Sequence, residues 1–347
     1  MLYFRNDYQV GCIPEIMKAL EANNSNIYMP HGQDVECQKA KDVLQSKMPD
    51  VHIDVHFVSG GTIANATIFK AILKPYEAVI ACKTAHIATR EAGAIEATGH
   101  KVIIVDDNDG KITPAAIEKT FNQHMLGYGM MVYPKAVFIS NATEMGTIYS
   151  EDELHAIHDK CKELGLYLIL DGERLGVTLM SGVGYTLNDI AKLCDIFTIG
   201  ISKNGGLFGS AIVITNPELE DGFPFVMKQT GAIMAKSWLI GLQFQVLFQD
   251  DKFYQLAKHE DELSIQLQNA LHNLGYPLLM KAYTNQVFPI LTNEQFEYLS
   301  ERVDFDIWDE WEGQYIIRLV TGFTTTQQDI NDLCEVLKET AKIKLKK

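Results

Sequence analysis

The chain has 347 residues, of which 47% are hydrophobic and 22% charged, a balance that is typical of globular proteins and excludes disordered, collagenous and fibrous chains. With 30 basic against 45 acidic residues, the formal net charge is −15. The overall field therefore repels nucleic acid and anionic membranes and favours a small-molecule partner. No apolar run reaches the roughly 18 to 20 residues that a transmembrane helix needs. The six cysteines are scattered, without a Cys-x-x-Cys pair, which indicates reduced thiols and a cytoplasmic protein.

Between about residues 50 and 215, short apolar runs alternate with amphipathic stretches, which is the pattern of βαβ units and a mostly parallel sheet. The predicted strands are 51–58, 78–81, 101–105, 136–140, 167–171, 196–201 and 210–215. Helices are predicted at 64–73, 114–122 and 150–164. The last of these opens on Ser150-Glu151-Asp152-Glu153, a capping box. Because the strands are apolar on both faces, the sheet requires cover on both sides.

After residue 231 the pattern changes to long helices. These are predicted at 232–248 and 253–274, followed by apolar segments at 286–291 and 316–321 and a terminal helix at 326–343. We therefore expect two domains: a large α/β domain over residues 1–248, and a small α+β domain over residues 249–347 that closes over the first.

The segment Ser59-Gly60-Gly61-Thr62 follows the first predicted strand and leads directly into a helix. Glycines let backbone amides approach an anion closely, the Thr62 hydroxyl adds a donor, and a helix amino end carries partial positive charge, so the segment suits a phosphate. It lacks the Gly-x-x-x-x-Gly-Lys of a nucleotide P-loop and the Gly-x-Gly-x-x-Gly of a dinucleotide site. An ordinary tight turn is the alternative.

Two further predicted strands end in charged residues. Asp171 follows the apolar run from Tyr167 directly, and a carboxylate in such a place requires a cationic or hydrogen-bonding partner. Lys203 closes the run from Ile196, and the glycines that follow it leave room for a ring. A buried lysine amine can lose its proton and form an imine with an aldehyde. A structural ion pair between Asp171 and Lys203 is the alternative.

Together these features resemble the pyridoxal phosphate enzymes of the aspartate aminotransferase fold, which combine a phosphate turn, an Asp at a strand end and a later Lys. Within that superfamily the sequence is similar, nearly end to end, to the threonine aldolases of the β-eliminating lyase group. The matching segments are Phe4-Arg5-Asn6-Asp7-Tyr8, Ala85-His86-Ile87, Glu91-Ala92-Gly93-Ala94-Ile95-Glu96, Gly99-His100-Lys101-Val102, Asp171-Gly172-Glu173-Arg174-Leu175-Gly176, Gly200-Ile201-Ser202-Lys203-Asn204-Gly205, Met227-Lys228-Gln229-Thr230-Gly231 and Arg318-Leu319-Val320-Thr321.

The resemblance implies pyridoxal 5'-phosphate as cofactor, on a mostly parallel seven-stranded sheet flanked by helices. It implies three catalytic residues: Lys203 as the Schiff-base lysine, Asp171 as the partner of the pyridinium nitrogen, and His86 stacked on the ring and bordering the substrate hydroxyl. The implied cofactor-binding residues are Gly60, Gly61, Thr62, His86, Asp171, Arg174, Lys203 and, from a neighbouring subunit, Lys228. The implied substrate-binding residues are Asn6, Arg174 and Arg318, of which Arg318 suits the carboxylate. No metal is expected.

The activity that the resemblance implies is retro-aldol cleavage of a threonine, allo-threonine or phenylserine type of substrate to glycine and an aldehyde. The alternatives are β-elimination or transamination on the same fold, or a protein of this fold without activity. A homodimer or homotetramer with the active site at the dimer interface is expected, with no nucleic acid or membrane partner.

The sequence departs from the family pattern at four places. One is Gly11-Cys12-Ile13-Pro14, where the closer-looking branch of the family often has Gly-Ala-His-Pro. Many relatives have an arginine where Lys228 stands, and an alanine where Glu173 adds a carboxylate that can alter the pKa of its neighbours. Better-known members carry a second histidine in an Asn-Thr-His stretch, where this chain has Thr143. The sequence therefore leaves the preferred substrate open.

Overall fold

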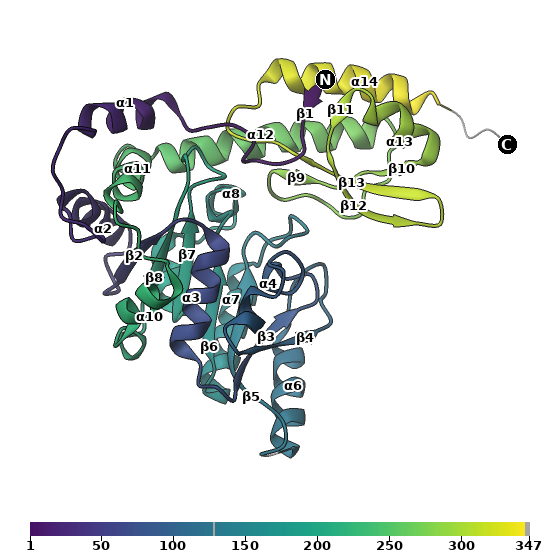
Figure 1. The fold of residues 1–347 in the computed structure, drawn as a ribbon. Helices are drawn as coiled ribbons and strands as arrows, with labels where there is room; N and C mark the ends of the chain where they lie inside the picture. The colour runs from purple at the N-terminus through teal and green to yellow at the C-terminus, as the bar shows by residue number, and fades with distance from the viewer. Residues whose placement is uncertain (128, 344–347) are drawn as a thin grey trace.

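A computed structural model describes residues 1–127 and 129–343, apart from the side chain of residue 311. Within them, a seven-stranded sheet runs in the order β2-β8-β7-β6-β5-β3-β4 (Figure 1). Its strands are β2 (Asp54–Val58), β3 (Glu77–Cys82), β4 (Lys101–Val105), β5 (Tyr133–Ser140), β6 (Tyr167–Asp171), β7 (Ile196–Gly200) and β8 (Ser210–Ile214). Neighbours pair in parallel except at β8, which is antiparallel to β2 and β7. The expected mostly parallel sheet is confirmed.

Helices flank this sheet. They are α1 (Pro14–Asn23), α2 (Val35–Lys47), α3 (Gly61–Ile72), α4 (His86–Thr89), α5 (Ala94–Ala97), α6 (Pro114–Leu126), α7 (Glu151–Leu164), α8 (Leu175–Met180), α9 (Leu187–Leu193), the 3₁₀ helix Pro217–Leu219, α10 (Phe223–Thr230) and α11 (Trp238–Gln249). The predicted capping box of α7 is confirmed, because Ser150 and Glu153 each accept a hydrogen bond from the other's backbone amide.

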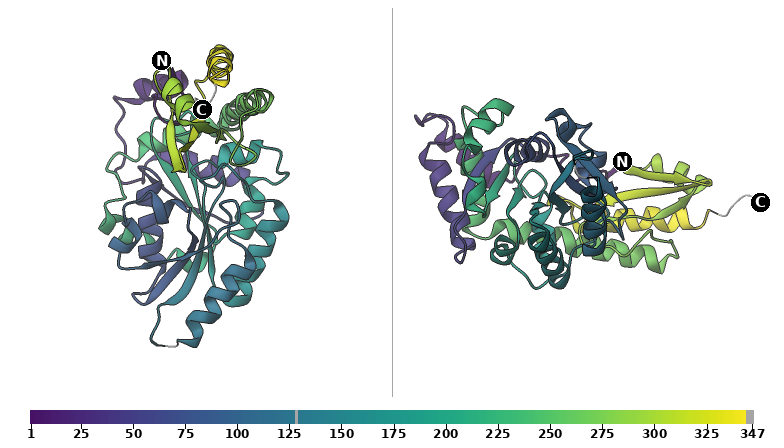
Figure 2. Two further views of the ribbon diagram at one scale, coloured as in Figure 1. Left: turned by 90° about the vertical axis from the view of Figure 1, so that its right-hand side faces the viewer. Right: turned by 90° about the horizontal axis from the view of Figure 1, so that it is seen from below.

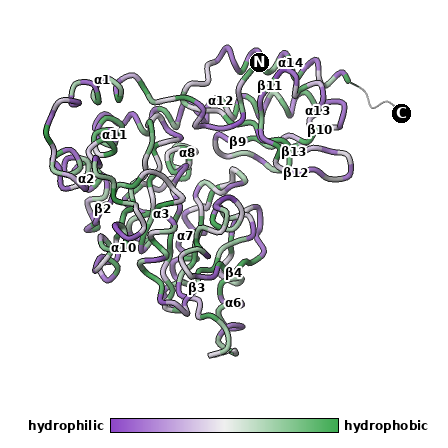
Figure 3. Tube along the Cα trace, viewed as in Figure 1, coloured by the Kyte–Doolittle hydropathy of each residue, from purple (hydrophilic) through white to green (hydrophobic). Residues whose placement is uncertain are grey.

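The central strands are buried on both faces, as their apolar sequences predict. Every residue of β3, β7 and β8 is buried, and the hydropathy-coloured trace is mainly hydrophobic through the sheet (Figure 3). Strands that are covered on both sides present few polar groups except at their ends. The ends are therefore where chemistry is to be sought.

One predicted helix is wrong in its extent. The segment predicted as a helix at 232–248 is helical only from Trp238: α10 ends at Thr230 with Gly231 as its C-cap, the chain turns through residues 232–237, and α11 begins at Trp238. Gly231 adopts a φ of 78°, in the left-handed region that glycine enters without strain. The hydrophobic pattern continues across this turn because the turn itself is partly buried, with Ala232 in the core.

A second group of elements lies beside one end of the large sheet (Figures 1 and 2). It consists of α12 (Lys252–Asn273), β9 (Gln286–Val287), β10 (Ile290–Thr292), α13 (Asn293–Ser300), β11 (Val303–Asp304), β12 (Asp306–Trp311), β13 (Gln314–Val320) and α14 (Gln327–Ala341). Strands β10, β13 and β12 form an antiparallel sheet, with β9 also pairing with β13.

Two hydrophobic clusters underlie these two groups of elements. Helix α12 joins them, since Phe253 packs in the first cluster and Leu263 in the second. The amino terminus belongs to the second: β1 (Leu2–Tyr3) pairs with β11, and Phe4 lies in that cluster. Among the described residues, no helix is both long enough and apolar enough to cross a membrane.

Candidate active site

A cavity of about 620 Å³ lies at the carboxyl ends of the parallel strands, where this type of sheet places its ligand sites. It brings together many of the residues that the sequence singled out. Those that line it are Gly61, Thr62, His86, Arg174, Lys203 and Arg318. They come from helix α3, from the ends of several strands and from β13, so the cavity is assembled by both groups of elements.

Asp171 and Lys203 follow two neighbouring strands, β6 and β7. The Asp171 side chain is buried, and its carboxylate accepts hydrogen bonds from the Asn65 amide at 3.2 Å and from the Glu173 backbone at 3.0 Å. Lys203 is half-buried and lines the cavity. Gly172 lets the chain cross close to β7, since a Cβ there would lie 2.0 Å from the Thr198 carbonyl oxygen.

The Gly-Gly-Thr segment forms the amino end of α3. Gly60 is the N-cap residue and offers no side chain to the first amides of the helix. Those N–H groups therefore remain available to an anion, and the partial positive charge of a helix amino end favours one. Gly61 and Thr62 line the cavity, while Gly60 stands directly behind them. This end of the cavity fits the phosphate of the expected cofactor.

His86 belongs to a buried hydrogen-bonded cluster. Its Nδ1 lies 2.8 Å from Oε1 of Glu91, and the Asn65 amide donates to Glu91 at 2.8 Å and to Asp171 at 3.2 Å. Burial opposes a charge on His86, but the hydrogen bond to Glu91 and the fields of Glu144 and Asp171 outweigh it and raise the pKa of His86. Ligand atoms of His86, Glu91 and Asp171 lie within 4.8 Å of one another, and the Asn65 N–H groups account for this closeness of two carboxylates.

Two arginines line the cavity. Arg174 donates two hydrogen bonds to Asp7, at 2.8 and 3.0 Å, and both side chains are buried. Arg318 donates to Gln286 at 3.1 Å and to Asp306 at 3.0 Å. Its Nε is buried and has no partner among the described residues. Burial and repulsion from Arg174 lower the pKa of Arg318, so this side of the cavity is suited to receiving an anion such as a substrate carboxylate.

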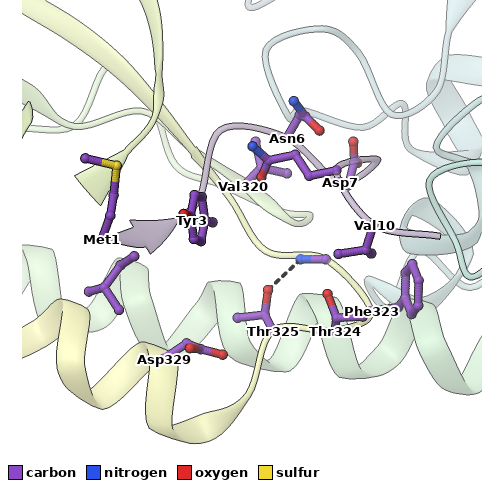
Figure 4. Close-up of a pocket in the computed structure, with 13 residues that line it drawn as sticks. Met1, Tyr3, Asn6, Asp7, Val10, Val320, Phe323, Thr324, Thr325 and Asp329 are labelled. Carbon is purple, nitrogen blue, oxygen red and sulfur yellow. Dashed lines mark hydrogen bonds between the residues drawn. The ribbon is translucent and has the colours of Figure 1, made fainter. Parts of the chain in front are cut away.

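Two predicted site residues lie away from this cavity. Asn6 lines a different one, of about 540 Å³, between the amino-terminal segment and the segment after β13 (Figure 4). Its neighbour Asp7 lines that second cavity too and reaches Arg174 through the ion pair. Lys228 is exposed on α10, outside the catalytic cavity of its own chain.

The departure at Glu173 adds a carboxylate to the cavity. A Cβ on Gly61 would lie 2.8 Å from Glu173 Cγ, so the glutamate occupies space that only a glycine leaves free. The Ser210 hydroxyl donates a hydrogen bond to Glu173. Burial and the charge of Asp171 raise the pKa of Glu173, against the opposing effects of Lys203 and Ser210.

The departure at Thr143 places a different residue in the cavity. Thr143 is buried, and its hydroxyl holds the turn through Thr147 and the Met145 amide. The next residue, Glu144, lines the cavity instead. Sequence reasoning missed Glu144, Arg90 and Asp306, which line the cavity, and Asn65, which binds Asp171. It also gave Asp7 no role of its own. For Glu144 a signal exists, because it closely follows the end of a predicted strand.

The chain is thus a pyridoxal phosphate-dependent enzyme of fold type I: a phosphate turn and a lysine line one cavity at the carboxyl ends of a mostly parallel sheet, and a buried carboxylate, Asp171, is hydrogen-bonded to the cavity residue Glu173. A sequence profile of the beta-eliminating lyase family matches residues 14–294. The chain belongs to this family.

Individual relatives agree with this assignment. The chain is 30% identical to the low specificity L-threonine aldolase of Pseudomonas aeruginosa, over 86% of this chain and 87% of that protein. It is 41% identical to a threonine aldolase of Leishmania major of known structure, with a TM-score of 0.96, covering 98% of this chain and 100% of the other. An aspartate aminotransferase of Thermus thermophilus, at 15% identity and a TM-score of 0.73 over 98% of this chain and 91% of the other, shares the fold.

Proposed function

We propose that this enzyme cleaves a β-hydroxy-α-amino acid of the threonine, allo-threonine or phenylserine type to glycine and an aldehyde. The observation that carries the proposal is that Lys203 and the guanidinium of Arg318 line one cavity beside Asp171. These groups suit the cofactor aldehyde, the substrate carboxylate and the cofactor ring nitrogen respectively. Threonine aldolases among the relatives support the same reaction.

Pyridoxal phosphate, when bound, withdraws electrons from the Cα of an attached amino acid. Gly60, Gly61 and Thr62 would hold its phosphate, and His86 would lie against its ring. Asp171 would keep a proton on the ring nitrogen, because a buried carboxylate favours a cation beside it. Lys203 would bind the aldehyde group and move the proton at Cα.

Arg318 and Arg174 orient the substrate. A planar guanidinium can hold a carboxylate through two hydrogen bonds and so fix the rotation about the bond to Cα. That rotation would select which bond at Cα breaks. In the proposed reaction this is the bond between Cα and Cβ. His86 borders the β-hydroxyl, whose proton must leave as the aldehyde forms.

The organisation that we propose around this site follows the family. Residues 1–248 form the cofactor-binding domain and residues 249–347 the small domain. The first strand, β1, packs with the small domain because it pairs with β11. The enzyme is a homodimer or homotetramer in which Lys228, exposed on α10, supports the phosphate of a neighbouring subunit. Six free cysteines support a location in the reducing cytoplasm.

An absorption spectrum of the purified protein, before and after addition of glycine or threonine, tests cofactor and ligand class together. We expect a visible band that changes with either amino acid, and release of acetaldehyde and glycine from threonine. Lys203→Ala should remove the band of the bound cofactor and the turnover. Full turnover by this variant would contradict the role of Lys203. Formation of a 2-oxo acid instead of an aldehyde would indicate β-elimination or transamination.

A further inference from the structure

Glu144 is a buried carboxylate that no part of the proposed reaction yet uses. It follows β5, lines the catalytic cavity and is 9% exposed. It makes no hydrogen bond and no ion pair with any residue that the structure describes, and its carboxylate oxygens open into the cavity instead of being enclosed by protein. An unpartnered acceptor that opens into a ligand cavity is available to a donor on the ligand.

The other carboxylates of the cavity have partners. Asp306 accepts from Arg318, and Glu173 accepts from the Ser210 hydroxyl. Among the cavity-lining residues that the structure describes, Glu144 is thus the carboxylate whose oxygens remain free to accept a proton or a hydrogen bond.

The order of the strands places Glu144 close to the reacting atoms. Strand β5 lies between β6, which ends in Asp171, and β3, which His86 closely follows. Glu144 therefore leaves the sheet edge between the residue proposed for the ring nitrogen and the residue that borders the substrate hydroxyl. Its charge acts on His86, Arg174 and Arg318 together, which puts it within electrostatic reach of both ends of a bound amino acid.

The imidazole of His86 is oriented by a buried carboxylate. Its Nδ1 lies 2.8 Å from Oε1 of Glu91. This contact fixes the ring, so His86 can position the substrate hydroxyl while a separate carboxylate receives the proton.

We propose that Glu144 is the catalytic base that receives the β-hydroxyl proton of the substrate. This inference rests on the proposed function and names a residue for one step of it. The O–H bond breaks toward the Glu144 carboxylate, and its electron pair becomes the second bond of the aldehyde carbonyl. The bond between Cα and Cβ breaks, and its pair stays with the Cα fragment. A proton added at Cα completes glycine, and Glu144 returns its proton to water, so that protons and electrons balance.

The test compares two reactions of the holoenzyme, of which one breaks the bond between Cα and Cβ and must remove a hydroxyl proton, and the other breaks a bond between Cα and hydrogen. Cleavage of threonine requires the base, whereas exchange of the glycine α-hydrogen with D₂O needs the cofactor, Lys203 and Arg318 but no hydroxyl base. We expect Glu144→Gln to lower kcat for cleavage about 100-fold. Glycine exchange, followed by NMR, and glycine affinity, measured by calorimetry, should change by less than about threefold. Glu144→Asp keeps a carboxylate and should restore part of the lost rate.

Glu151→Gln, an exposed position in the first turn of α7, provides the matched control and should leave both reactions unchanged. If Glu144→Gln cleaves threonine at the wild-type rate, the proposal for Glu144 is overturned, while the proposed function of the enzyme is unaffected. Equal losses of cleavage and exchange also overturn it, because they indicate a structural role. If the wild-type enzyme releases no aldehyde while still exchanging glycine, the proposed function falls, and this step with it.

Discussion

The two halves of the cavity are built in different ways. In the half proposed for the cofactor, Gly61, Asp171 and Lys203 lie at or just after the carboxyl ends of β2, β6 and β7, which belong to one sheet. In the substrate half, Arg174 is held by Asp7, 167 residues away, and Arg318 by side chains of the second group of elements. The first half follows from the local order of strands and helices, whereas the second exists only when distant parts of the chain have folded together.

Removing the guanidinium of the substrate half should have the largest effect. Arg318→Leu deletes the group proposed for the substrate carboxylate, and a lost charge-assisted, two-pronged contact is expected to lower kcat/KM roughly 1,000-fold. Because the cofactor half is separate, the spectrum and affinity of bound pyridoxal phosphate should be unchanged. Steady-state kinetics measure the expected loss in kcat/KM, and a cofactor titration tests whether the affinity for pyridoxal phosphate is unchanged. A variant that loses cofactor and substrate together would show that the two halves are not independent.

The scaffold of the substrate half should matter for stability. Asp7→Asn leaves buried Arg174 without its counter-charge, which is expected to cost about 3 kcal/mol of unfolding free energy at pH 7. Burial works against ionisation of Asp7, but Arg174 outweighs it and lowers the pKa of Asp7. The stabilisation is therefore complete above the unfolded pKa of about 3.9 and is lost as pH falls through the lower folded value.

Urea unfolding at several pH values measures this effect. The wild-type protein and Asp7→Asn should differ most at neutral pH and converge under acid conditions. Asp50→Asn removes an exposed partner of Lys192 and serves as the control, with no measurable change expected. A difference between wild type and Asp7→Asn that stays constant down to the acid limit would contradict the assigned charge pair.

The matching change in the cofactor half is Asn65→Ala. The Asn65 amide lies between the carboxylates of Glu91 and Asp171, so its loss leaves two buried like charges facing each other. We expect the Kd of pyridoxal phosphate to rise about 10- to 100-fold, the equivalent of one lost hydrogen bond to a charged group. Once the enzyme is saturated with cofactor, KM for threonine should stay near the wild-type value. A change in KM for threonine without a change in the Kd of pyridoxal phosphate would instead indicate that Asn65 supports substrate binding, which would contradict the prediction.

This division also explains what the sequence could predict. Asp171 and Lys203 each end an apolar run, so strand order alone brings them together. Glu144 obeys the same rule after β5 and was recoverable in principle. Asp7 carries no such signal, because its role depends on a contact with Arg174 across the whole domain. The sequence also carries no signal that α11 begins only at Trp238, because the turn between α10 and α11 is itself apolar.

A buried carboxylate outside the cavity completes the comparison. Asp261 on α12 is buried, and both of its oxygens are enclosed without a partner among the described residues, whereas the unpartnered oxygens of Glu144 open into the cavity. Asp261 is not one of the residues that line the catalytic cavity. Burial raises the pKa of Asp261 to about 9. Since the folded pKa lies above the unfolded one, the cost of this residue is absent under acid conditions and grows as pH rises toward the folded value.

Asp261→Asn should therefore stabilise the protein at pH 8, by about 1 to 2 kcal/mol, and leave stability nearly unchanged near pH 4. Catalysis at pH 8 should be unaffected, because no substrate group reaches this position. Thermal unfolding at the two pH values and aldehyde release measure both outcomes. The opposite result would be slower cleavage by Asp261→Asn with unchanged stability. An unpartnered carboxylate outside the cavity would then affect catalysis as well, and the absence of a partner could no longer be used to identify Glu144 as the base.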